Sequence, residues 1–372
     1  MSQKRILYLS RGGSIGGSQR QLLYLIQNLE RRIYKPYVIY RKKGEFANIL
    51  RQLQVDKLFY PLHSWRKFKF VLHRYYDADK LIRYAQQNQI SLVHSSDLWL
   101  SPYMLTVARR LNIPSVLHIR TPIRQKDVYK HKCHRSDKII AISTRVVRNL
   151  IEAGIHPDKT VQVDDGVDLE LFRPINDGKI LLRGLSADTD LLIGVAGCIS
   201  ESKRQLDFAK AAELVIKSCC KKVFFLIIGP CYSEAYFRKL KRYIESNGLL
   251  GKVLFAGERD DMPQVLSSLG VLVSLSGGSV MFEAMACGTP VISAGFTSPE
   301  ESVHIQNEKT GLLVPSRSSS ELAAAMVRLI EDNSLRTVIA QRARNWAVHN
   351  FSHHEMVRKT IQVYAQLLNK NN

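Results

Sequence analysis

The sequence lacks any apolar run of the length that a membrane-spanning helix needs, about 18–20 residues, and its first residues lack the apolar core of a secretion signal. Cysteine is scarce, with 6 in 372 residues, and Cys219 and Cys220 are adjacent. This spacing fits no disulfide framework of a small secreted domain. These absences argue against an integral membrane protein and against a disulfide-stabilised secreted one, and we expect reduced thiols and a cytoplasmic location.

The dinucleotide-binding pattern Gly-x-Gly-x-x-Gly is missing as well. A glycine-rich loop at residues 12–17 follows the first apolar segment, but Ser14 occupies the position of the second glycine. Arg41, Lys42 and Lys43 follow the second predicted strand, where a nicotinamide-dependent enzyme needs an acid for the ribose. NAD-dependent chemistry is therefore disfavoured, although an NADP-like site stays open. The loop amides could bind another anion at a helix start, or the loop could be a turn without a ligand.

Acidic residues are few relative to basic ones, and the deficit is uneven. The formal net charge is +21. Residues 1–175 hold 31 Lys and Arg against 14 Asp and Glu, whereas residues 176–372 hold 23 against 19. The first half therefore presents a basic surface to an anionic partner, for which nucleic acid, an anionic membrane and phosphorylated substrates are the candidates.

The chain is longer than one hydrophobic core usually allows, so two domains are expected. Apolar strand patterns alternate with helix patterns from residue 4 onward, and the alternation starts again at Leu191. Such alternation predicts parallel, doubly wound α/β sheets. The predicted domains are residues 1–175 and 176–350, with a linker at 172–190 and a C-terminal helix at 351–372 that packs back towards the first domain.

The most informative segment is residues 277–291, in which a small-residue turn leads into a short helix that Gly288, Thr289 and Pro290 end. Glu283 is the one acid in this apolar helix. A buried carboxylate is costly unless it is hydrogen-bonded, and a ribose diol would supply that bond. The free N–H groups at the helix start would suit a diphosphate. From the residues alone, a helix whose glutamate faces solvent is an equal alternative.

Residues 283–292, Glu-Ala-Met-Ala-Cys-Gly-Thr-Pro-Val-Ile, resemble the donor-binding signature of family 4 glycosyltransferases. Residues 165–174 and 310–315 resemble two further segments of that family, and the resemblance covers nearly the whole chain. It implies the GT-B fold, which is two Rossmann-like parallel α/β domains facing each other across a cleft. It also implies a retaining enzyme without a metal or other cofactor, whose N-terminal domain binds the acceptor and whose C-terminal domain binds a nucleotide sugar.

The resemblance further implies roles for individual residues. His118, Lys203 and Glu283 are expected to be catalytic: His118 supports charge on the donor sugar, Lys203 neutralises the diphosphate and Glu283 holds the ribose. His94 and Arg120 are acceptor-side candidates. The residues expected to contact the donor are Gly16, Gly17, Lys203, Arg204, Gly278, Ser279, Val280 and Glu283.

Three residues depart from the family pattern. Cys198 stands where family members commonly carry an arginine for the diphosphate, and Arg204 is expected to compensate. Leu275 stands where the first of two paired glutamates lies near the donor sugar, so sugar identity and catalytic rate stay open. Asp165 replaces an asparagine in a segment that we interpret as mainly structural.

We therefore expect transfer of a sugar from a UDP- or GDP-sugar to a hydroxyl of a carbohydrate or lipid-linked acceptor, in polysaccharide, lipopolysaccharide or glycolipid synthesis. A non-catalytic sugar-nucleotide-binding subunit is the alternative. A nucleic-acid-binding protein is less favoured, because the positive charge comes without a recognition motif, and no specific nucleic acid partner is expected.

Two other clusters have weaker interpretations. Residues 65–71 interleave aromatic and basic side chains, which favours peripheral binding to the inner face of an anionic membrane. A helix or strand edge with solvated cations is the alternative. His131, Cys133 and His134 resemble metal ligands, but no partner pair follows at a suitable spacing, and we interpret them as surface residues.

Overall fold

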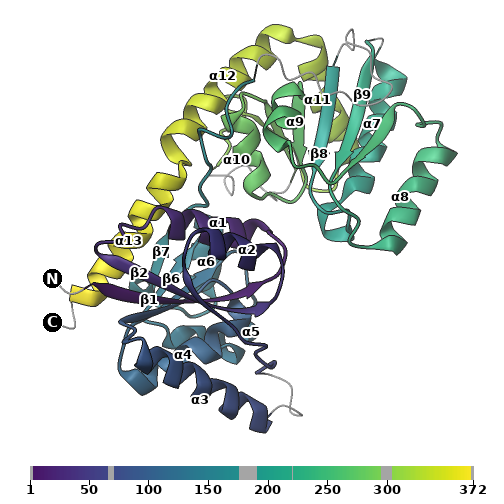
Figure 1. Ribbon diagram of the computed structural model, residues 1–372. Helices are drawn as coiled ribbons and strands as arrows, with labels where there is room; N and C mark the ends of the chain where they lie inside the picture. Colours follow the sequence, from purple (N-terminus) through teal and green to yellow (C-terminus); the bar gives the residue numbers. More distant parts are fainter. Residues whose placement is uncertain (1–2, 66–70, 176–190, 220, 295–303, 370–372) are drawn as a thin grey trace. The chain divides into compact units, whose positions relative to one another are not determined.

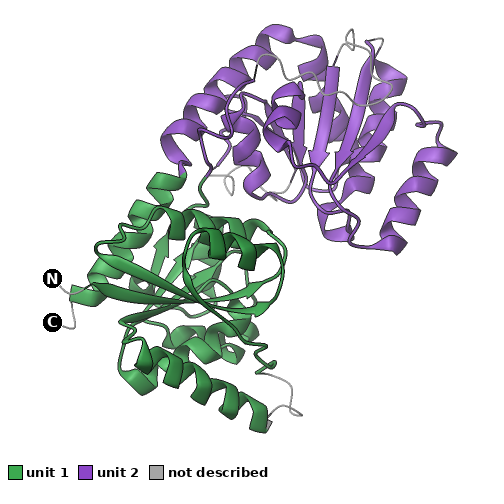
Figure 2. Ribbon diagram, in the orientation of Figure 1, with its two compact units in different colours: residues 1–166, 353–372 green, residues 167–352 purple. Residues whose placement is uncertain are grey.

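The computed structural model describes residues 3–65, 71–175, 191–219, 221–294 and 304–369. The chain forms two compact units (Figure 2): unit 1 comprises Met1–Gly166 with His353–Asn372, and unit 2 comprises Val167–Ser352. Unit 1 thus ends at Gly166 and not at the expected residue 175. The reason is that Val167 and Phe172 are buried together with Phe351 in a core of unit 2.

Unit 1 is built on a seven-stranded sheet in which neighbouring strands pair in parallel in the order β3-β2-β1-β4-β5-β6-β7 (Figure 1). The strands are β1 (Lys4–Gly12), β2 (Tyr34–Lys42), β3 (Asp56–Phe59), β4 (Leu92–Ser95), β5 (Ser115–Ile119), β6 (Lys138–Ala141) and β7 (Thr160–Gln162).

Alternate residues of the central strands enter different cores, because successive side chains of a strand point to opposite faces. Leu7 and Leu9 pack with one group of helices, and Ile6 and Tyr8 pack with the other. The first group is α3 (Val71–Gln87), α4 (Ser101–Leu111), α5 (Gln125–Lys130) and α6 (Thr144–Glu152). The second is α1 (Gly17–Gln27), α2 (Glu45–Gln52) and α13 (His353–Asn369).

Unit 2 repeats this plan with a six-stranded parallel sheet in the order β10-β9-β8-β11-β12-β13. Its strands are β8 (Leu191–Ala196), β9 (Val223–Ile228), β10 (Val253–Gly257), β11 (Val271–Ser274), β12 (Val291–Ser293) and β13 (Leu312–Leu313). One face carries α7 (Gln205–Ser218), α8 (Glu234–Ser246) and α11 (Ser319–Glu331); the other carries α9 (Met262–Ser268), α10 (Ser279–Ala286) and the second half of α12 (Asn333–Asn350).

Both sheets have the Rossmann strand order, with the reversal between β1 and β4 in unit 1 and between β8 and β11 in unit 2. Ligands of such sheets bind outside the carboxyl ends of the strands at this reversal. The segments found there are the loops after Gly12 and Ser95 in unit 1 and those after Ala196 and Ser274 in unit 2. None of the described helices is long and apolar enough to cross a bilayer.

Candidate functional site

Lys203 lies between the two loops at the strand reversal of unit 2. Its methylene groups lie 3.5 Å from the place where a Cβ on Gly197 would stand, and its Nζ lies 3.9 Å from the corresponding place on Gly278. Gly197 and Gly278 have φ values of +140° and +118°, a backbone conformation that favours glycine. Glycine is thus favoured at both positions by its backbone conformation, and the Lys203 side chain packs beside Gly197 with its ammonium group next to Gly278, at the start of α10.

The amino end of α10 is open to an anion. Gly278 at the cap position has no side chain to bind the first N–H groups, and the first turn contains no acid. Gly278 is exposed, and Ser279 and Val280 are partly exposed. A helix start with free N–H groups and a nearby ammonium group is a favourable place for a phosphate. The structure thus places Lys203 beside Gly278, the residue that precedes Ser279 and Val280 in the chain.

Glu283 lies near the middle of α10, one turn beyond Ser279, and only 4 % of its surface is exposed. The alternative of a glutamate facing solvent is therefore wrong. Burial favours a role in which the Glu283 carboxylate is hydrogen-bonded, because an ionised carboxylate removed from water needs hydrogen-bonding partners. Glu300 and Glu301, near the next family-like segment, lie outside the described residues.

Arg204 has a different role from the one expected. Its Nη1 donates to the carbonyl oxygens of Leu275 and Ala294, both at 3.1 Å, and to Ser316 Oγ at 2.9 Å. Nε and Nη2 bind the carboxylate of Asp207, each at 2.8 Å. Most of its donors are engaged within unit 2, so Arg204 ties the start of α7 to the ends of β11 and β12. Compensation for Cys198 by this guanidinium is not supported by the geometry.

Cys198 and Leu275, the two residues of unit 2 that depart from the family pattern, lie in different surroundings. Cys198 is a free, partly exposed thiol next to Ser200, and its carbonyl accepts a hydrogen bond from Gln205 Nε2 at 3.0 Å. Leu275 is 3 % exposed and packs in the core with α7 and α11. An apolar side chain thus fills the position where the family resemblance leads one to expect a carboxylate.

In unit 1, the glycine loop divides into two parts. Gly12 and Gly13 have positive φ values and pack against Lys42 and Gly44, so they are required by the fold. Gly17 has no atom within 4 Å of its would-be Cβ, and Gly16 meets only the side chain of Gln19. The amino end of α1 has no side-chain cap and no acid in its first turn. Gly16 and Gly17 are thus the two glycines that leave room for a ligand.

His94 and His118 lie on neighbouring strands as a stacked pair with ring centres 5.8 Å apart. Both are buried, with His94 Nδ1 2.5 Å from the hydroxyl of Tyr364 in α13. Nε2 of each ring has no hydrogen-bond partner among the residues that the structure describes. Burial and the charge of Arg120 lower the pKa of His94 to about 3 and that of His118 well below its usual value. Both imidazoles are therefore neutral at physiological pH.

Arg120 forms an ion pair with Asp165, the residue that replaces the family asparagine. The pair is largely buried, and Arg120 Nε has no partner within the described residues. The next residue, Gly166, is held by Gln21, which donates to its carbonyl at 2.7 Å and accepts from its N–H at 2.8 Å. The segment after β7 is thus anchored from two sides, in agreement with a structural role.

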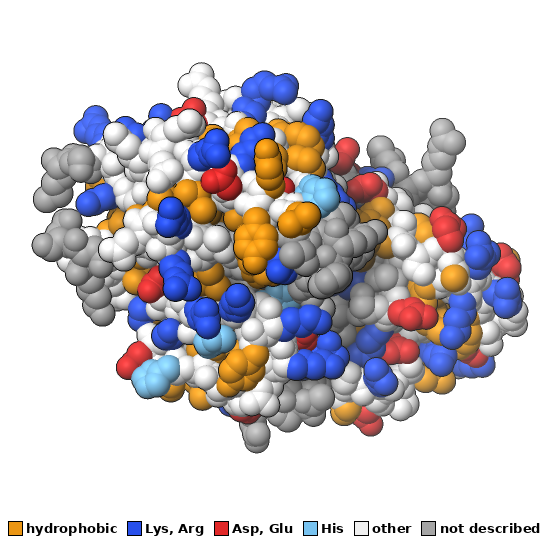
Figure 3. All heavy atoms as spheres, turned by 90° about the horizontal axis from the view of Figure 1, so that it is seen from below, with side chains coloured by type: hydrophobic (Ala, Val, Ile, Leu, Met, Phe, Trp, Pro, Cys, Tyr) orange, Lys and Arg blue, Asp and Glu red, His pale blue; other side chains and the backbone are white. Residues whose placement is uncertain are grey.

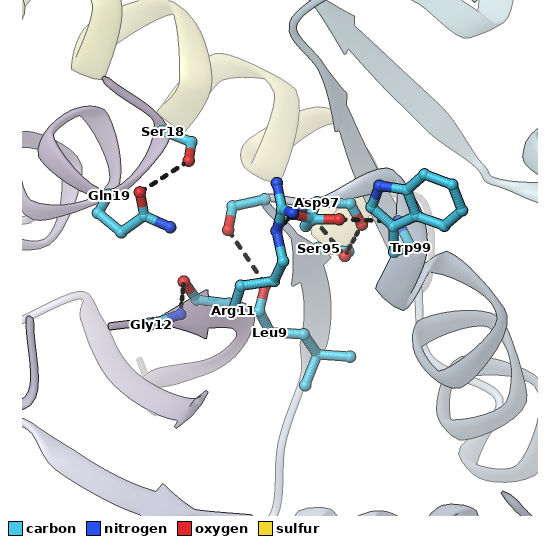
Figure 4. Close-up of polar contacts among 10 residues, drawn as sticks. Leu9, Arg11, Gly12, Ser18, Gln19, Ser95, Asp97 and Trp99 are labelled. Carbon is cyan, nitrogen blue, oxygen red and sulfur yellow. Dashed lines mark hydrogen bonds and ion pairs between the residues drawn. The ribbon is translucent and has the colours of Figure 1, made fainter. Parts of the chain in front are cut away.

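Sequence reasoning missed a cluster at the reversal point of unit 1. Arg11, at the end of β1, forms an ion pair with Asp97, just after β4 (Figure 4). Asp97 Oδ1 also accepts the N–H of Trp99 at 2.8 Å, and Ser95 Oγ donates to the Asp97 carbonyl at 2.8 Å. The sequence did contain a signal for this cluster, because its polar residues lie at or directly after the ends of two predicted strands. Such residues meet at the same sheet edge when the strands are parallel neighbours.

Metal-binding arrangements are not found within the described part of the chain, where no three His, Cys, Asp or Glu side chains group around a common point. Two Asp-x-Asp triplets occur in the sequence, at residues 77–79 and 188–190. In the first, Asp77 is buried and hydrogen-bonded, and Asp79 pairs with Arg83. The second lies outside the described residues.

The interpretation of His131 and Cys133 as surface residues is wrong. Both are buried, with Cys133 in the core of unit 1 and His131 edge-on to Trp99 at 4.9 Å. Burial raises the pKa of the Cys133 thiol to about 12.

Comparison with known sequences covers both halves of the chain. Residues 15–171 match the family described as glycosyltransferase family 4, and residues 182–346 match that described as glycosyl transferases group 1. N-acetyl-alpha-D-glucosaminyl L-malate synthase of Bacillus anthracis is 22% identical over 310 residues, 78% of each chain. An uncharacterized glycosyltransferase of Methanocaldococcus jannaschii is 24% identical over 243 residues, which span 63% of this chain but only 60% of that relative.

Comparison with solved structures shows the fold. HepE of Anabaena, solved in complex with UDP and glucose, superposes with a TM-score of 0.85 at 21% identity, covering 98% of this chain and 100% of the other. Sucrose-phosphate synthase from Thermosynechococcus elongatus superposes with a TM-score of 0.80 at 18% identity, covering 99% and 100%. Since the two family matches together span most of the chain and both units have the parallel α/β sheets of these enzymes, the chain belongs to the family 4 glycosyltransferases of GT-B fold and is a glycosyltransferase.

Proposed function

We propose that this enzyme transfers a sugar, with retention of configuration, from a nucleoside diphosphate sugar to an acceptor hydroxyl. UDP is the favoured nucleotide over GDP, because HepE has been solved with UDP and with UDP-glucose. A role in polysaccharide, lipopolysaccharide or glycolipid synthesis is part of the proposal. Unit 2 is assigned to the donor and unit 1 to the acceptor.

The observation that carries the proposal is the position of Lys203 in front of the open amino end of α10. Departure of the nucleoside diphosphate leaves negative charge on the phosphates and positive charge on the sugar. Preorganised donors that face the developing charge lower the barrier, since they need no rearrangement during the reaction. The donors assigned to the phosphates are Lys203 Nζ and the N–H groups of Ser279 and Val280, and Glu283 is assigned to the ribose.

His118 is proposed to act on the transferred sugar, and its neutral ring suits that role. A protonated imidazole would repel the positive charge that develops on the sugar, whereas a neutral ring supports it with its dipole. No step of the proposed reaction requires a metal or a further cofactor.

Calorimetric titration with UDP, GDP and ADP tests the donor assignment. One nucleotide is expected to bind more tightly than the other two, and Glu283→Ala is expected to weaken that binding at least tenfold. Glu245→Ala, at the exposed end of α8, serves as the matched control and should bind like the wild type. Unchanged binding in Glu283→Ala would remove the ribose role. Binding without transfer or donor hydrolysis for every sugar tested would favour the non-catalytic alternative.

We also propose that unit 1 binds peripherally to an anionic membrane. On α3, Leu72, Tyr75 and Tyr76 are 81%, 63% and 82% exposed, and Arg74, Lys80 and Arg83 lie on the same helix. Figure 3 shows hydrophobic side chains next to Lys and Arg side chains on the face seen from below. Aromatic and aliphatic groups enter the headgroup zone while cations bind anionic lipid. Residues 66–70 of the predicted membrane segment lie outside the described residues.

Flotation with phosphatidylcholine vesicles, with and without phosphatidylglycerol, tests this proposal. Recovery with the anionic vesicles is expected to be several-fold higher and to fall in the double variant Leu72→Ser, Tyr76→Ser. Leu250→Ser, a 67% exposed position of unit 2, is the control. Equal recovery from both vesicle types would contradict the electrostatic contribution.

A further inference from the structure

A cavity of about 170 Å³ opens at the carboxyl edge of the sheet in unit 1. Its lining comes from segments that follow four adjacent strands: Arg11 from β1, Arg41 from β2, His63 and Trp65 from beyond β3, and Trp99 from beyond β4. This volume equals that of roughly six water molecules at ~30 Å³ each. The cavity therefore has room for one saccharide ring or a small acid rather than for a chain.

The two arginines make the cavity electropositive. Arg11 pairs with Asp97 through Nε, which fixes the guanidinium and leaves its Nη groups as donors (Figure 4). Arg41 is partly exposed, and its side chain makes no hydrogen bond or ion pair with any part of the chain that the structure describes. Guanidinium groups bind carboxylates and phosphates through paired N–H donors. Asp97 is already engaged by Arg11 and by the N–H of Trp99, so the remaining donors outnumber the acceptors.

The part of the cavity wall that contains His63 is held in place by a buried carboxylate. Asp77 of α3 accepts hydrogen bonds from Tyr60 and Tyr103 hydroxyls, both at 2.9 Å, and from the N–H of His63 at 2.8 Å. Its Oδ2 also lies 3.0 Å from His63 Nδ1. Asp77 is 1 % exposed, so this network is shielded from water and orients the imidazole. The segment that carries His63 and Trp65 is thus preorganised rather than loose.

The aromatic residues supply flat apolar surface. Trp99 is 48% exposed, and Trp65 stands edge-on to Tyr103 at 4.9 Å. Binding sites for small molecules combine such apolar walls with a few fixed polar groups that set orientation. Here the apolar walls suit the carbon face of a sugar ring, and the guanidinium groups suit an acidic substituent on that ring.

We propose that this cavity binds the acceptor and that the acceptor is a saccharide or small acid carrying a carboxylate or phosphate. The inference rests on the proposed function, because it names the acceptor class for the transfer described above. Arg41 and Arg11 hold the oxyanion, Trp99 packs on the ring, and His63 contacts a hydroxyl. The acidic group, rather than the sugar stereochemistry alone, selects the acceptor.

Binding of three soluble probes to the full-length protein tests the inference: glucose, glucuronate and glucose 6-phosphate, titrated with and without UDP. Both anionic sugars are expected to bind at least tenfold more tightly than glucose, and the tighter of the two identifies the acidic group. Arg41→Gln should remove most of this advantage, whereas Trp99→Ala should weaken all three probes. Arg109→Gln is the matched control, because Arg109 is an exposed cation of α4 that lines a separate hollow.

Three results would overturn the inference: equal affinity for neutral and anionic sugars, equal losses in Arg41→Gln and Arg109→Gln, or no binding of either anionic sugar. A parallel titration with UDP distinguishes failure of the acceptor inference from failure of the proposed function, since UDP is assigned to unit 2. Retained UDP binding with no preference for anionic sugars rejects only the acceptor class. Absence of UDP binding by the wild-type protein rejects the proposed function.

Discussion

Lys203 and Arg204 are consecutive cations with different surroundings. Lys203 faces the start of α10 without an ion pair among the described residues, whereas Arg204 is bonded to three segments of unit 2. Sequence position alone could not separate them. Arg204 has φ +60°, so the chain turns between the two residues and sends their side chains to different places.

We predict that Lys203→Met weakens UDP binding about 10- to 100-fold, as expected for the loss of a charge-assisted bond worth ~1.5–3 kcal/mol. The melting temperature of Lys203→Met should stay close to that of the wild type. Arg204→Met should instead destabilise unit 2 by about 2–3 kcal/mol, because buried carbonyl oxygens lose their donor. Calorimetry and thermal unfolding of both variants check the contrast. A larger loss of stability in Lys203→Met than in Arg204→Met would contradict it.

The buried histidine pair predicts a dependence of stability on pH. The folded chain keeps His94 neutral down to a pKa of about 3, and His118 also titrates well below its usual pKa, whereas the unfolded chain takes up these protons near pH 6.5. Stability is therefore fully present above pH 6.5 and falls on acidification, by about 1.4 kcal/mol per pH unit for each histidine. Urea unfolding between pH 7.5 and 5 measures this slope.

His94→Gln should reduce that slope, because one of the two buried sites is removed. His349→Gln, an exposed position of α12, should keep the wild-type slope. If stability rose on acidification, the assignment of neutral buried rings would be wrong.

At the scale of elements, the sequence indicated the alternating strands and helices because their cores are continuous apolar runs. Strands β3 and β7 were not predicted: all four residues of β3 and all three of β7 are at least partly exposed, so neither has a clear apolar signal. The turn and helix at residues 277–286 were predicted, since α10 carries a long local motif. The cavity proposed for the acceptor was not, because Arg11, Arg41, His63 and Trp99 come together only through the strand order.

Helix α13 completes a core of unit 1 from the far end of the sequence. Met356, Val357, Val363 and Leu368 are buried beside residues of β1 and α1, and the two helices pack together. Tyr364 is fully buried, contacts His94 Nδ1 at 2.5 Å and donates to Tyr8 Oη at 3.3 Å. A single hydroxyl thus connects the C-terminal helix to two central strands.

Tyr364→Phe is expected to destabilise unit 1 by about 1–3 kcal/mol, because His94 Nδ1 loses its partner in a buried site. Hydrogen exchange followed by mass spectrometry should show faster exchange in β1, β4 and α13 and unchanged exchange in β8 and β9. Tyr232→Phe, 69% exposed in unit 2, is the control. Equal exchange in wild type and variant would show that the hydroxyl adds nothing to stability.

At the scale of the whole molecule, the chain passes from one unit to the other at Gly166–Val167 and again at Ser352–His353. On the side of unit 1, a Cβ on Gly166 would lie 2.4 Å from His353 Cα. On the side of unit 2, the N–H of Val167 donates to the Phe351 carbonyl at 2.7 Å. The two passages are therefore held next to each other in each unit, and glycine is required at residue 166.

Gly166→Ala is expected to lower stability by about 1–3 kcal/mol, the usual cost of forcing a methyl group into a packed site. Gly17→Ala, where no atom lies within 4 Å of the added methyl group, should change stability little. Differential scanning calorimetry of both variants distinguishes crowding from a general effect of replacing glycine. Similar melting temperatures for the two variants would show that the backbone at His353 yields.

The return of α13 to unit 1 has a consequence for synthesis on the ribosome. Residues 356–368 leave the exit tunnel after every strand of unit 2 has been made. Until then, the apolar surface of unit 1 that α13 covers stays exposed. Unit 2 is a contiguous stretch and can close its cores first, so the half of the enzyme that is translated first is the half that finishes folding last.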